Sequence, residues 1–429
     1  WTRDALADAG LTHEDIEAWP DANVHFEQLD RDATSLDPLA TRIETLESAH
    51  RLPGNRVFYL AVPPSVFPNT IDRLGLAGLN KSPGWTRLVI EKPFGTDLAS
   101  AHELNDLVHR CFSEPQVYRI DHYLGKETVQ NVLTFRFSNP MFEHLWNRDR
   151  VESIEITVAE DLGIAGRAGY YETAGALRDM VQNHLTQVLT LVAMEPPVSF
   201  DADQIRNEKV KVIEAIAPIS TDDVVFGQYE AGSMAGEPVP AYRDEEGVDA
   251  ESQTPTFVGL RLQIDTWRWQ GVPFYLRTGK RLPRQLTQVA VTFLPPPLCI
   301  FHGARDGCDM APNVLLITLQ PDEGFTLRFS VKAPGAPLTI ESQELRFSHD
   351  DVYGPLPDAY QALIQDVIEG DQTLFVRSDE TEASWRLYDQ LLSCEHELHG
   401  YAAGTWGPAV RDGSPALGGK SWIANNPAP

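Results

Sequence analysis

The segment Arg119–Glu127 reads RIDHYLGKE and follows directly on the apolar run Gln116–Ile120. Two similar runs precede it, Arg56–Val62 and Thr86–Glu91, and residues 97–112 repeat apolar side chains with helical spacing. Short apolar strands that alternate with helices are typical of βαβ units with a parallel sheet. In such sheets ligands bind beyond the carboxyl ends of the strands, which is where RIDHYLGKE stands. The sequence therefore predicts a parallel α/β part with a candidate site at its last strand.

The pattern changes after about residue 150. Apolar and polar residues then alternate around Ile156, Leu262 and Ile317, which predicts half-buried antiparallel strands. A long helix is expected over Gly175–Met194, with an apolar face that includes Val181. We therefore expect a parallel α/β part followed by a larger α+β domain.

The composition excludes several classes of protein. The 429 residues carry a formal net charge of -27, and such a surface repels nucleic acid and anionic membranes. No apolar run is long enough for a membrane-spanning helix, and the four cysteines form no dense framework, so a reducing compartment is expected. Two clusters contain possible zinc ligands but no tight ligand pair, so no metal is expected. These clusters are Cys299, His302 and Cys308, and Cys394, His396 and His399.

Four segments carry candidate chemistry, each with a plainer alternative. Gly163–Gly169 has the glycines of a phosphate loop, but it follows an alternating strand and is better interpreted as a strand-to-helix connection. In RIDHYLGKE, Lys126 near a helix start suits a phosphate, or it is a solvated lysine. Asp121 and His122 are neighbours, so on a strand they would point to opposite faces and would not be partners of each other.

The other two segments are a polar cluster and a basic turn. RDMVQNH, residues 178–184, places many polar groups on an apolar helix, where His184 is either a satisfied core histidine or part of a site. Four cations lie close together in the sequence, which indicates either a basic surface loop or an anion pocket in this acidic chain. They are Arg277, Lys280, Arg281 and Arg284.

Five motifs together resemble a known family. RIDHYLGKE, RDMVQNH, EKPFG (Glu91–Gly95), VPFYLRTGK (Val272–Lys280) and FVRSDE (Phe375–Glu380) resemble, in order and separation, the signatures of glucose-6-phosphate dehydrogenase. The resemblance implies an incomplete Rossmann-like NADP-binding domain over residues 1–120. It also implies a substrate-binding and dimerisation domain over residues 121–429, with a large antiparallel sheet and helices. The expected protein is a cytoplasmic homodimer or homotetramer without a metal.

The implied reaction is oxidation of D-glucose 6-phosphate at C1 to 6-phosphoglucono-1,5-lactone, with hydride transfer to NADP. This is the first step of the oxidative pentose phosphate pathway. By resemblance, His184 is the base and Asp121 orients it. The residues implied to bind substrate are His122, Tyr123, Lys126, Glu160, Asp179, Lys280, Gln320 and Lys92. Those implied to bind the cofactor are Arg3, Val62, Pro63, Pro64 and Lys92.

Two departures from the family pattern lead to further expectations. The chain lacks the family's Gly-x-x-Gly-Asp-Leu turn, so we expect this chain to bind NADP weakly or to be inactive. Gln285 stands where the family usually has a basic residue, and Arg284 is the candidate substitute. The alternatives are a non-catalytic or truncated dehydrogenase-like binding or assembly subunit, or a related hexose-6-phosphate dehydrogenase that uses NAD. Replacing Arg3 should impair NADP use more than NAD use if Arg3 contacts the 2′-phosphate.

Overall fold

The structure is a computed structural model that describes residues 24–28, 35–298, 300–301, 311–335, 338–354, 358–394, 396–409 and 422–425. The chain forms two compact units, one from Trp1–Arg56 with Pro68–Thr86 and one from Val57–Phe67 with Arg87–Pro429. The predicted roles of Arg3 and of the cluster Cys299, His302 and Cys308 fall outside the described residues.

The described part of the first unit contains α3 (Asp37–His50) and most of α4 (Phe67–Leu76). α3 has a proline in its first turn, where the backbone N–H groups have no partner within the helix. Arg56 donates through Nε and Nη2 to the two carboxylate oxygens of Glu47, at 2.7 and 2.8 Å. This paired contact holds the last turn of α3 to the residue at which the chain enters its first strand.

The second unit contains a four-stranded sheet in the order β1-β2-β3-β14. β2 and β3 pair in parallel, and α5 (Leu98–Cys111) connects them, which confirms the predicted βαβ arrangement. β14 then adds to β3 in the antiparallel sense, so the FVRSDE segment lies beside Arg119 and Ile120. The strands are β1 (Arg56–Leu60), β2 (Thr86–Ile90), β3 (Val117–Ile120) and β14 (Phe375–Val376).

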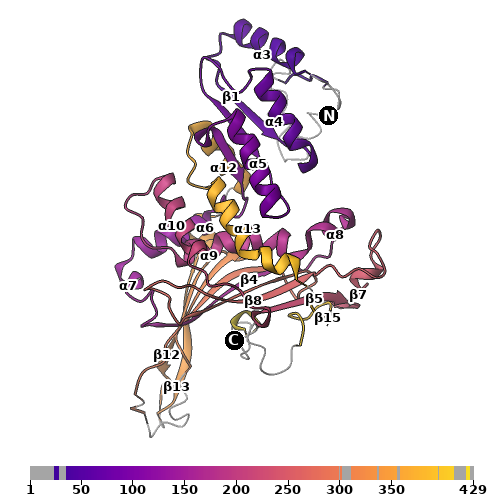
Figure 1. Cartoon of the computed structure of the whole chain (residues 1–429). Helices are drawn as coiled ribbons and strands as arrows, with labels where there is room; N and C mark the ends of the chain where they lie inside the picture. The colour runs from indigo at the N-terminus through magenta and orange to yellow at the C-terminus, as the bar shows by residue number, and fades with distance from the viewer. Residues whose placement is uncertain are drawn as a thin grey trace. The chain divides into compact units, whose positions relative to one another are not determined.

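A nine-stranded sheet forms the larger part of the second unit, in the order β13-β12-β11-β10-β4-β9-β8-β5-β15. Most neighbours are antiparallel, as predicted, but β4 pairs with β9 and β5 pairs with β15 in parallel. In Figure 1 the β12–β13 end of this sheet extends as a narrow hairpin. The strands are β4 (Val151–Ala159), β5 (Val224–Glu230), β8 (Phe257–Gln263), β9 (Pro273–Gly279), β10 (Leu286–Phe293), β11 (Val314–Gln320), β12 (Gly324–Lys332), β13 (Ile340–Ser348) and β15 (Leu398–Ala402).

The central strands are more buried than the alternating pattern predicts. In β4 only Glu152 and Glu155 are not fully buried, so the expectation of half-buried strands was wrong here. Helices cover one face, and on β4 a C-terminal segment reaches Glu155, whose Oε2 accepts from the Ile423 N–H at 2.9 Å. A sheet covered on both faces reads as mostly apolar rather than as a strict alternation.

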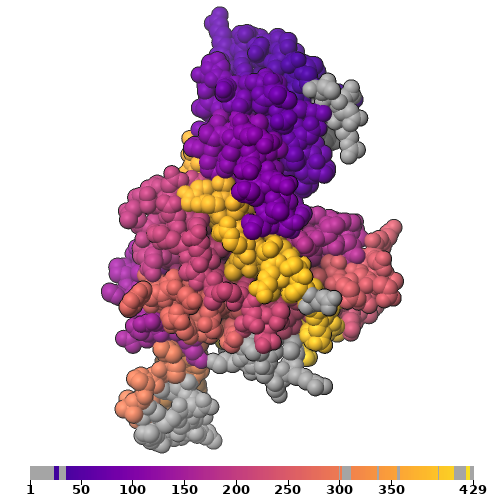
Figure 2. All heavy atoms as spheres, in the orientation of Figure 1, coloured from indigo at the N-terminus to yellow at the C-terminus, as the bar shows by residue number. Residues whose placement is uncertain are grey.

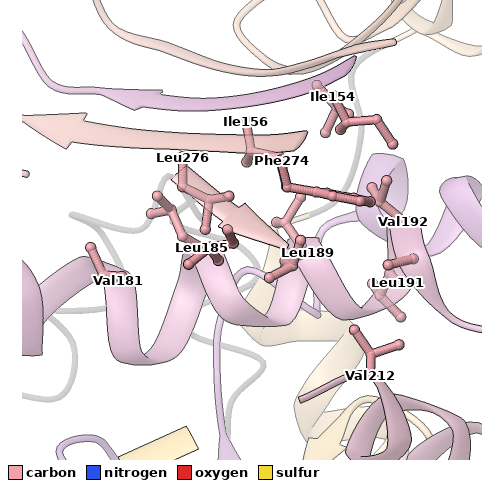
Figure 3. Packing of buried hydrophobic residues seen from close by; sticks show 14 of the residues in the cluster. Ile154, Ile156, Val181, Leu185, Leu189, Leu191, Val192, Val212, Phe274 and Leu276 are labelled. Atoms are coloured by element: carbon pink, nitrogen blue, oxygen red, sulfur yellow. The ribbon is translucent and has the colours of Figure 1, made fainter. Parts of the chain in front are cut away.

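One helical stretch forms the centre of the core beneath β4 and β9. Figure 3 shows Leu185 and Leu189 directed at the strands, where Ile156, Phe274 and Leu276 meet them. All five side chains are buried in one apolar cluster. Each buried side chain of this size contributes about 1.5–3 kcal/mol to the free energy of folding, so this contact fixes the stretch firmly against the sheet.

The predicted helix over Gly175–Met194 is divided into three parts. α8 (Ala168–Ala176) breaks at Gly175, whose φ of 58° and ψ of 176° favour glycine because it has no Cβ. The next segment, η4 (Leu177–Leu185), is π-helical, and α9 (Thr186–Ala193) then continues as an α-helix. The break and the wider turn set the direction of every side chain from residue 177 onward.

Further helices pack around these sheets. α10 packs against α9 and α13, α13 also packs against α5 and η4, and α6 contacts α9 and β11. α12 instead packs on the four-stranded sheet through Leu363 and Val367. Figure 2 shows α13, in yellow, exposed along one side in this view. These helices are α6 (Glu127–Phe137), α10 (Ala202–Glu214), α12 (Ala359–Glu369) and α13 (Ser378–Ser393).

Short elements complete the described fold. They are η2 (Pro64–Val66), η3 (Glu114–Gln116), α7 (Pro140–Glu143), η5 (Thr221–Asp223), β6 (Gly232–Met234), β7 (Glu237–Val239), η6 (Tyr242–Asp244), α11 (His349–Tyr353) and η8 (Ile423–Asn425). Among the residues described, no helix is both long enough and apolar enough to cross a lipid bilayer.

We expect Phe274→Ala to destabilise the larger unit. Phe274 is fully buried between β9 and the helical stretch, so its truncation should lower the free energy of unfolding by about 3–5 kcal/mol. Urea unfolding followed by circular dichroism measures this change. Val198→Ala is the matched control, because that side chain is 87% exposed and should change stability by less than about 0.5 kcal/mol. Equal stability of the two variants would contradict the packing described.

Candidate active site

The carboxyl ends of β2 and β3 place two charged side chains at one edge of the four-stranded sheet. Lys92 comes two residues after β2, and Asp121 comes directly after β3. Because these strands are parallel, their carboxyl ends meet at the same edge. His184 reaches this edge from η4, so three distant segments of the sequence converge there.

His184 and Asp121 form a buried pair. The Nδ1 atom of His184 lies 2.6 Å from Oδ1 of Asp121, and both side chains are almost completely excluded from solvent. The same carboxylate oxygen accepts from the backbone N–H of Tyr123 at 3.0 Å. A carboxylate oxygen accepts, so Nδ1 carries the hydrogen and the imidazole is oriented with Nε2 directed away from Asp121.

Lys92 contacts the other ring nitrogen of His184. Its Nζ atom lies 2.7 Å from Nε2. A lysine ammonium only donates, so Nε2 accepts and the imidazole is neutral. Burial lowers the pKa of His184, and the charge of Lys92 lowers it further. Asp121 raises it, but the pKa stays below the ordinary value.

Asp121 remains ionised in this environment. Burial alone would raise the pKa of its carboxyl group, but His184, His122 and Lys92 together lower it well below its usual range. Its second oxygen, Oδ2, is buried without a hydrogen-bond partner among the residues that the structure describes. A neutral imidazole held by a buried carboxylate is a suitable general base near neutral pH.

Asp179 also contacts the ammonium group of Lys92. Lys92 Nζ donates to the backbone oxygen of Asp179 at 3.2 Å and approaches its Oδ1 at 3.4 Å, while the Tyr170 hydroxyl donates to the same Oδ1 at 3.1 Å. Burial would raise the pKa of Asp179, but Lys92, Lys280 and His184 lower it overall. Tyr170 was missed in the sequence, because the break at Gly175 removes any regular spacing between it and Asp179.

The next two residues of RIDHYLGKE pack around the imidazole. The Tyr123 ring stacks on His184 at 4.3 Å between centroids, and the His122 ring meets it edge-on at 4.7 Å. The expectation that Asp121 and His122 point to opposite faces was wrong, because β3 ends at Ile120 and a turn brings both to His184. Burial, with His184 next to it, lowers the pKa of His122 to about 4, so this ring is neutral at pH 7.

Donor atoms of Asp121, His122 and His184 all lie within 4.8 Å of one another, a spacing that a metal ion would accept. Lys92 donates into the Nε2 lone pair of His184, and its positive charge opposes a second cation at that nitrogen. The arrangement therefore favours proton transfer over metal ligation.

Lys126 and Gln320 meet at one side of this aromatic group. Lys126 is the N-cap residue of α6, as its place near a helix start suggested, and its ammonium donates to Oε1 of Gln320. The same ammonium lies 4.6 Å from the centroid of the Tyr123 ring. Burial lowers the pKa of Lys126, and Glu323 and Asp121 counteract this only in part. A partly buried ammonium beside backbone N–H groups at a helix N-terminus suits an anion.

Glu160 and Lys280 form a second pair near Asp179. They follow the paired parallel strands β4 and β9, in which Ala159 lies opposite Gly279. Lys280 Nζ consequently donates to Oε2 of Glu160 at 2.8 Å, and Lys280 is buried. The contribution of Lys280 to the lowered pKa of Asp179 places this pair within electrostatic reach of it.

The four neighbouring cations do not form one anion pocket. Arg277 is buried between the rings of Trp406 and Trp422, at 4.7 and 4.3 Å from their centroids. Lys280 pairs with Glu160, and Arg281 lies 3.7 Å from Glu245. Arg284 donates to the backbone oxygen of Ala424. Each has its own partner, so the expectation of a shared pocket was wrong, and the guanidinium of Arg284 is directed to the C-terminal segment.

The exposed segment after β1 fits the apolar face of a nicotinamide ring. Val62, Pro63 and Pro64 are exposed at the carboxyl end of that strand, and Val62 is 40% exposed. Exposed apolar side chains at the end of a strand can contact a flat ring. The described residues of the cofactor set are therefore chemically compatible with a nicotinamide dinucleotide.

We expect Lys92→Met to raise the pKa of His184. The ammonium lowers that pKa by its charge, so an uncharged side chain of similar length should move it up toward the ordinary imidazole value. The pH dependence of the His184 ring resonances in an NMR spectrum measures the shift. Lys211→Met, which removes an exposed lysine on α10, is the control and should leave these resonances unchanged. An unchanged or lower pKa in Lys92→Met would refute the electrostatic role.

Comparison with known proteins agrees with these observations over most of the chain. Residues 7–131 match the family model of the glucose-6-phosphate dehydrogenase NAD binding domain, and residues 133–423 match that of the C-terminal domain. The glucose-6-phosphate 1-dehydrogenase of Aggregatibacter actinomycetemcomitans is 45% identical over 393 residues, which covers 90% of this chain and 78% of the relative. That of Chlamydia trachomatis is 41% identical over 424 residues, covering 95% and 96%.

Two solved structures are also similar. One, described as glucose-6-phosphate dehydrogenase in complex with its substrate glucose-6-phosphate, has a TM-score of 0.83 and 36% identity, covering 92% of this chain and 82% of that one. The glucose-6-phosphate 1-dehydrogenase of Mycobacterium avium has a TM-score of 0.81 and 33% identity, covering 95% and 84%. With both domains matched and these identities over most of its length, the chain belongs to the glucose-6-phosphate dehydrogenase family.

Proposed function

We propose that this chain oxidises D-glucose 6-phosphate at C1 to 6-phosphoglucono-1,5-lactone, the first step of the oxidative pentose phosphate pathway. The observation that carries the proposal is the buried His184, held by Asp121 at Nδ1, with its Nε2 lone pair directed at a donor. When substrate is bound, we propose that this donor is the C1 hydroxyl group. The family to which the chain belongs supports the same reaction.

His184 acts as the general base. The O–H proton of the C1 hydroxyl passes to Nε2, the C1–H bond breaks with its electron pair, and a carbon–oxygen double bond forms. Asp121 stabilises the imidazolium that results, since its ionised carboxylate lies 2.6 Å from Nδ1. Because the neutral imidazole is the active form, kcat/KM should fall only when pH drops through the lowered pKa of His184.

Lys92 must leave Nε2 before the substrate hydroxyl can take its place. Its second set of contacts, to the backbone and side-chain oxygens of Asp179, allows this exchange over a short distance. While Lys92 occupies Nε2 it keeps the base neutral and excludes other proton donors. We therefore assign to Lys92 both the preparation of the base and a contact to the bound substrate.

Three further groups of residues bind the sugar phosphate. Lys126, with His122 and Tyr123, binds the phosphate group, because Lys126 is a partly buried cation at the N-terminus of α6. Glu160 and Asp179 accept hydrogen bonds from sugar hydroxyls. Lys280 fixes the acceptor Glu160, and Gln320 fixes the phosphate-binding Lys126. These roles rest on the contacts Lys280–Glu160 and Lys126–Gln320 and on the family resemblance.

The family uses a nicotinamide cofactor, which supplies the hydride acceptor when it is bound. We propose NADP rather than NAD, with Arg3 toward its 2′-phosphate, Val62, Pro63 and Pro64 against the nicotinamide, and Lys92 between cofactor and substrate. We also propose the cofactor domain over residues 1–120, the substrate and dimerisation domain over residues 121–429, a homodimer or homotetramer, and a cytoplasmic location.

We expect His184→Asn to lose catalysis while it retains substrate binding. An amide cannot take up the proton, so kcat should fall by about 10²–10⁴-fold, while the Kd for glucose 6-phosphate stays within a few-fold. Initial rates of nicotinamide reduction and isothermal titration calorimetry measure the two quantities. His144→Asn changes an exposed histidine outside the site and should behave as wild type. Wild-type kcat in His184→Asn would disprove the assignment of the base.

We expect Lys126→Ala to raise KM for glucose 6-phosphate far more than it lowers kcat. A phosphate contact binds ground state and transition state alike, so its loss weakens binding uniformly. Saturation kinetics measure the split, and unphosphorylated glucose should be affected little. Binding of the sugar phosphate without turnover in the unaltered protein would instead favour the alternative of a non-catalytic binding subunit.

A further inference from the structure

The buried side of α13 donates hydrogen bonds to the segment that carries His184 and to the segment that carries Lys92. Ser384 Oγ donates to the backbone oxygen of Gln182 at 2.5 Å, and Trp385 Nε1 donates to the backbone oxygen of Phe94 at 2.9 Å. Gln182 lies two residues before His184, and Phe94 lies two residues after Lys92. One helix therefore contacts the backbone close to both partners of the Nε2–Nζ contact.

A third residue of α13, Tyr388, contacts the His184 segment through the hydroxyl group of Thr186. Thr186 Oγ1 donates its single hydrogen to the backbone oxygen of Val181 at 2.7 Å. The Tyr388 hydroxyl lies 2.9 Å from Thr186 Oγ1, and because that hydrogen is already used, Tyr388 is the donor. Ser384, Thr186 and Tyr388 are all buried, so water does not compete for these contacts.

These contacts coincide with the π-helical turn. A π-helix pairs each carbonyl five residues along instead of four, and such turns occur mainly as short insertions in α-helices, often at functional sites. The carbonyls of Val181 and Gln182 belong to this turn and receive hydroxyl donors in addition to the helical ladder. The hydroxyl groups thus stabilise a wide turn whose backbone otherwise has α-helical alternatives.

α13 is itself held firmly at its N-terminal part. Lys209 of α10 lies 2.8 Å from Glu380, and both side chains are buried. Asn105 of α5 donates to Glu382 at 2.9 Å. α13 also packs against η4, and Figure 1 shows its labelled ribbon between α5 and β4 in this view. A helix fixed by two neighbours can serve as a reference for the two catalytic segments.

We propose that three residues of α13 are positioning residues: Ser384 and Tyr388 fix His184 for the bound substrate, and Trp385 sets the approach of Lys92 Nζ to Nε2 in the free protein. The proposal rests on the proposed roles of His184 and Lys92. Tertiary contacts of this kind matter because a misplacement of about 1 Å can cost about 10²-fold in rate.

The test compares hydroxyl-deleting variants of α13 that differ in what the lost hydroxyl touches. Ser384→Ala and Tyr388→Phe should lower kcat about tenfold or more while KM for glucose 6-phosphate changes less than about threefold. Thr381→Val is the matched control, because the buried Thr381 hydroxyl donates to the backbone oxygen of Arg377, the N-cap residue of the same helix, and not to a catalytic segment. Its kcat should stay at the wild-type value with a similar loss of thermal stability. Equal kcat losses in all three variants would overturn the proposal.

Two further measurements separate this proposal from the assignment of the base. In a His184→Asn background, Ser384→Ala should cause little additional loss, because a residue that acts through His184 has nothing left to position. A full additional loss would overturn the proposal, whereas an active His184→Asn would disprove the base itself.

Trp385→Phe should move the acid limb of kcat/KM to higher pH, because a looser Lys92 lowers the pKa of His184 less. An acid limb that does not move would contradict the role of Trp385. As a separate check, Ser384→Thr keeps the hydroxyl group and should restore the kcat that is lost in Ser384→Ala.

Discussion

The buried contact between His184 and Asp121 is the constraint on which the rest of the site depends. An ionised carboxylate excluded from water is costly unless it has donors, so Asp121 must meet the imidazole and the Tyr123 N–H at the same time. The two side chains come from the end of β3 and from η4, 63 residues apart. The nine-stranded sheet, its covering helices and the break at Gly175 together bring those ends into contact.

Much of the site could be predicted because its chemistry is tied to strand ends. Lys92 and Asp121 follow short apolar strands, and residues in that position of a parallel sheet meet at one edge. Glu160 and Lys280 likewise follow β4 and β9, although their pairing depends on a parallel register that alternating apolar residues do not reveal. The opposite-face argument for Asp121 and His122 failed because it needed the strand to continue past Ile120, and the end of a strand is set by its partners rather than by its own residues.

The π-helical turn and its supports lay beyond prediction from the sequence. The apolar spacing of residues 177–192 is equally compatible with a continuous α-helix, because the two helices differ in hydrogen-bond register and not in residue type. Two donors that contact this region, Ser384 directly and Tyr388 through Thr186, lie about 200 residues later in the chain, beyond the reach of local sequence patterns. Tyr170 was missed for a related reason, since the break at Gly175 decouples its position from that of Asp179.

The dispersed cations around Arg281 show why charge density along a sequence is a poor guide to a site. Residues that alternate along a strand point to opposite faces, so Arg277 on β9 enters a stack of indole rings while Lys280, just past the strand end, turns to Glu160. Each cation meets a different group: Arg277 meets two indole rings, Lys280 and Arg281 meet carboxylates, and Arg284 meets a backbone oxygen. The cations to which we assign roles in the site, Lys92, Lys126 and Lys280, are widely separated in the sequence, and each lies just after a strand or at a helix start. Position at a strand end or a helix start, and not local abundance, is therefore what the cations that we assign to the site have in common.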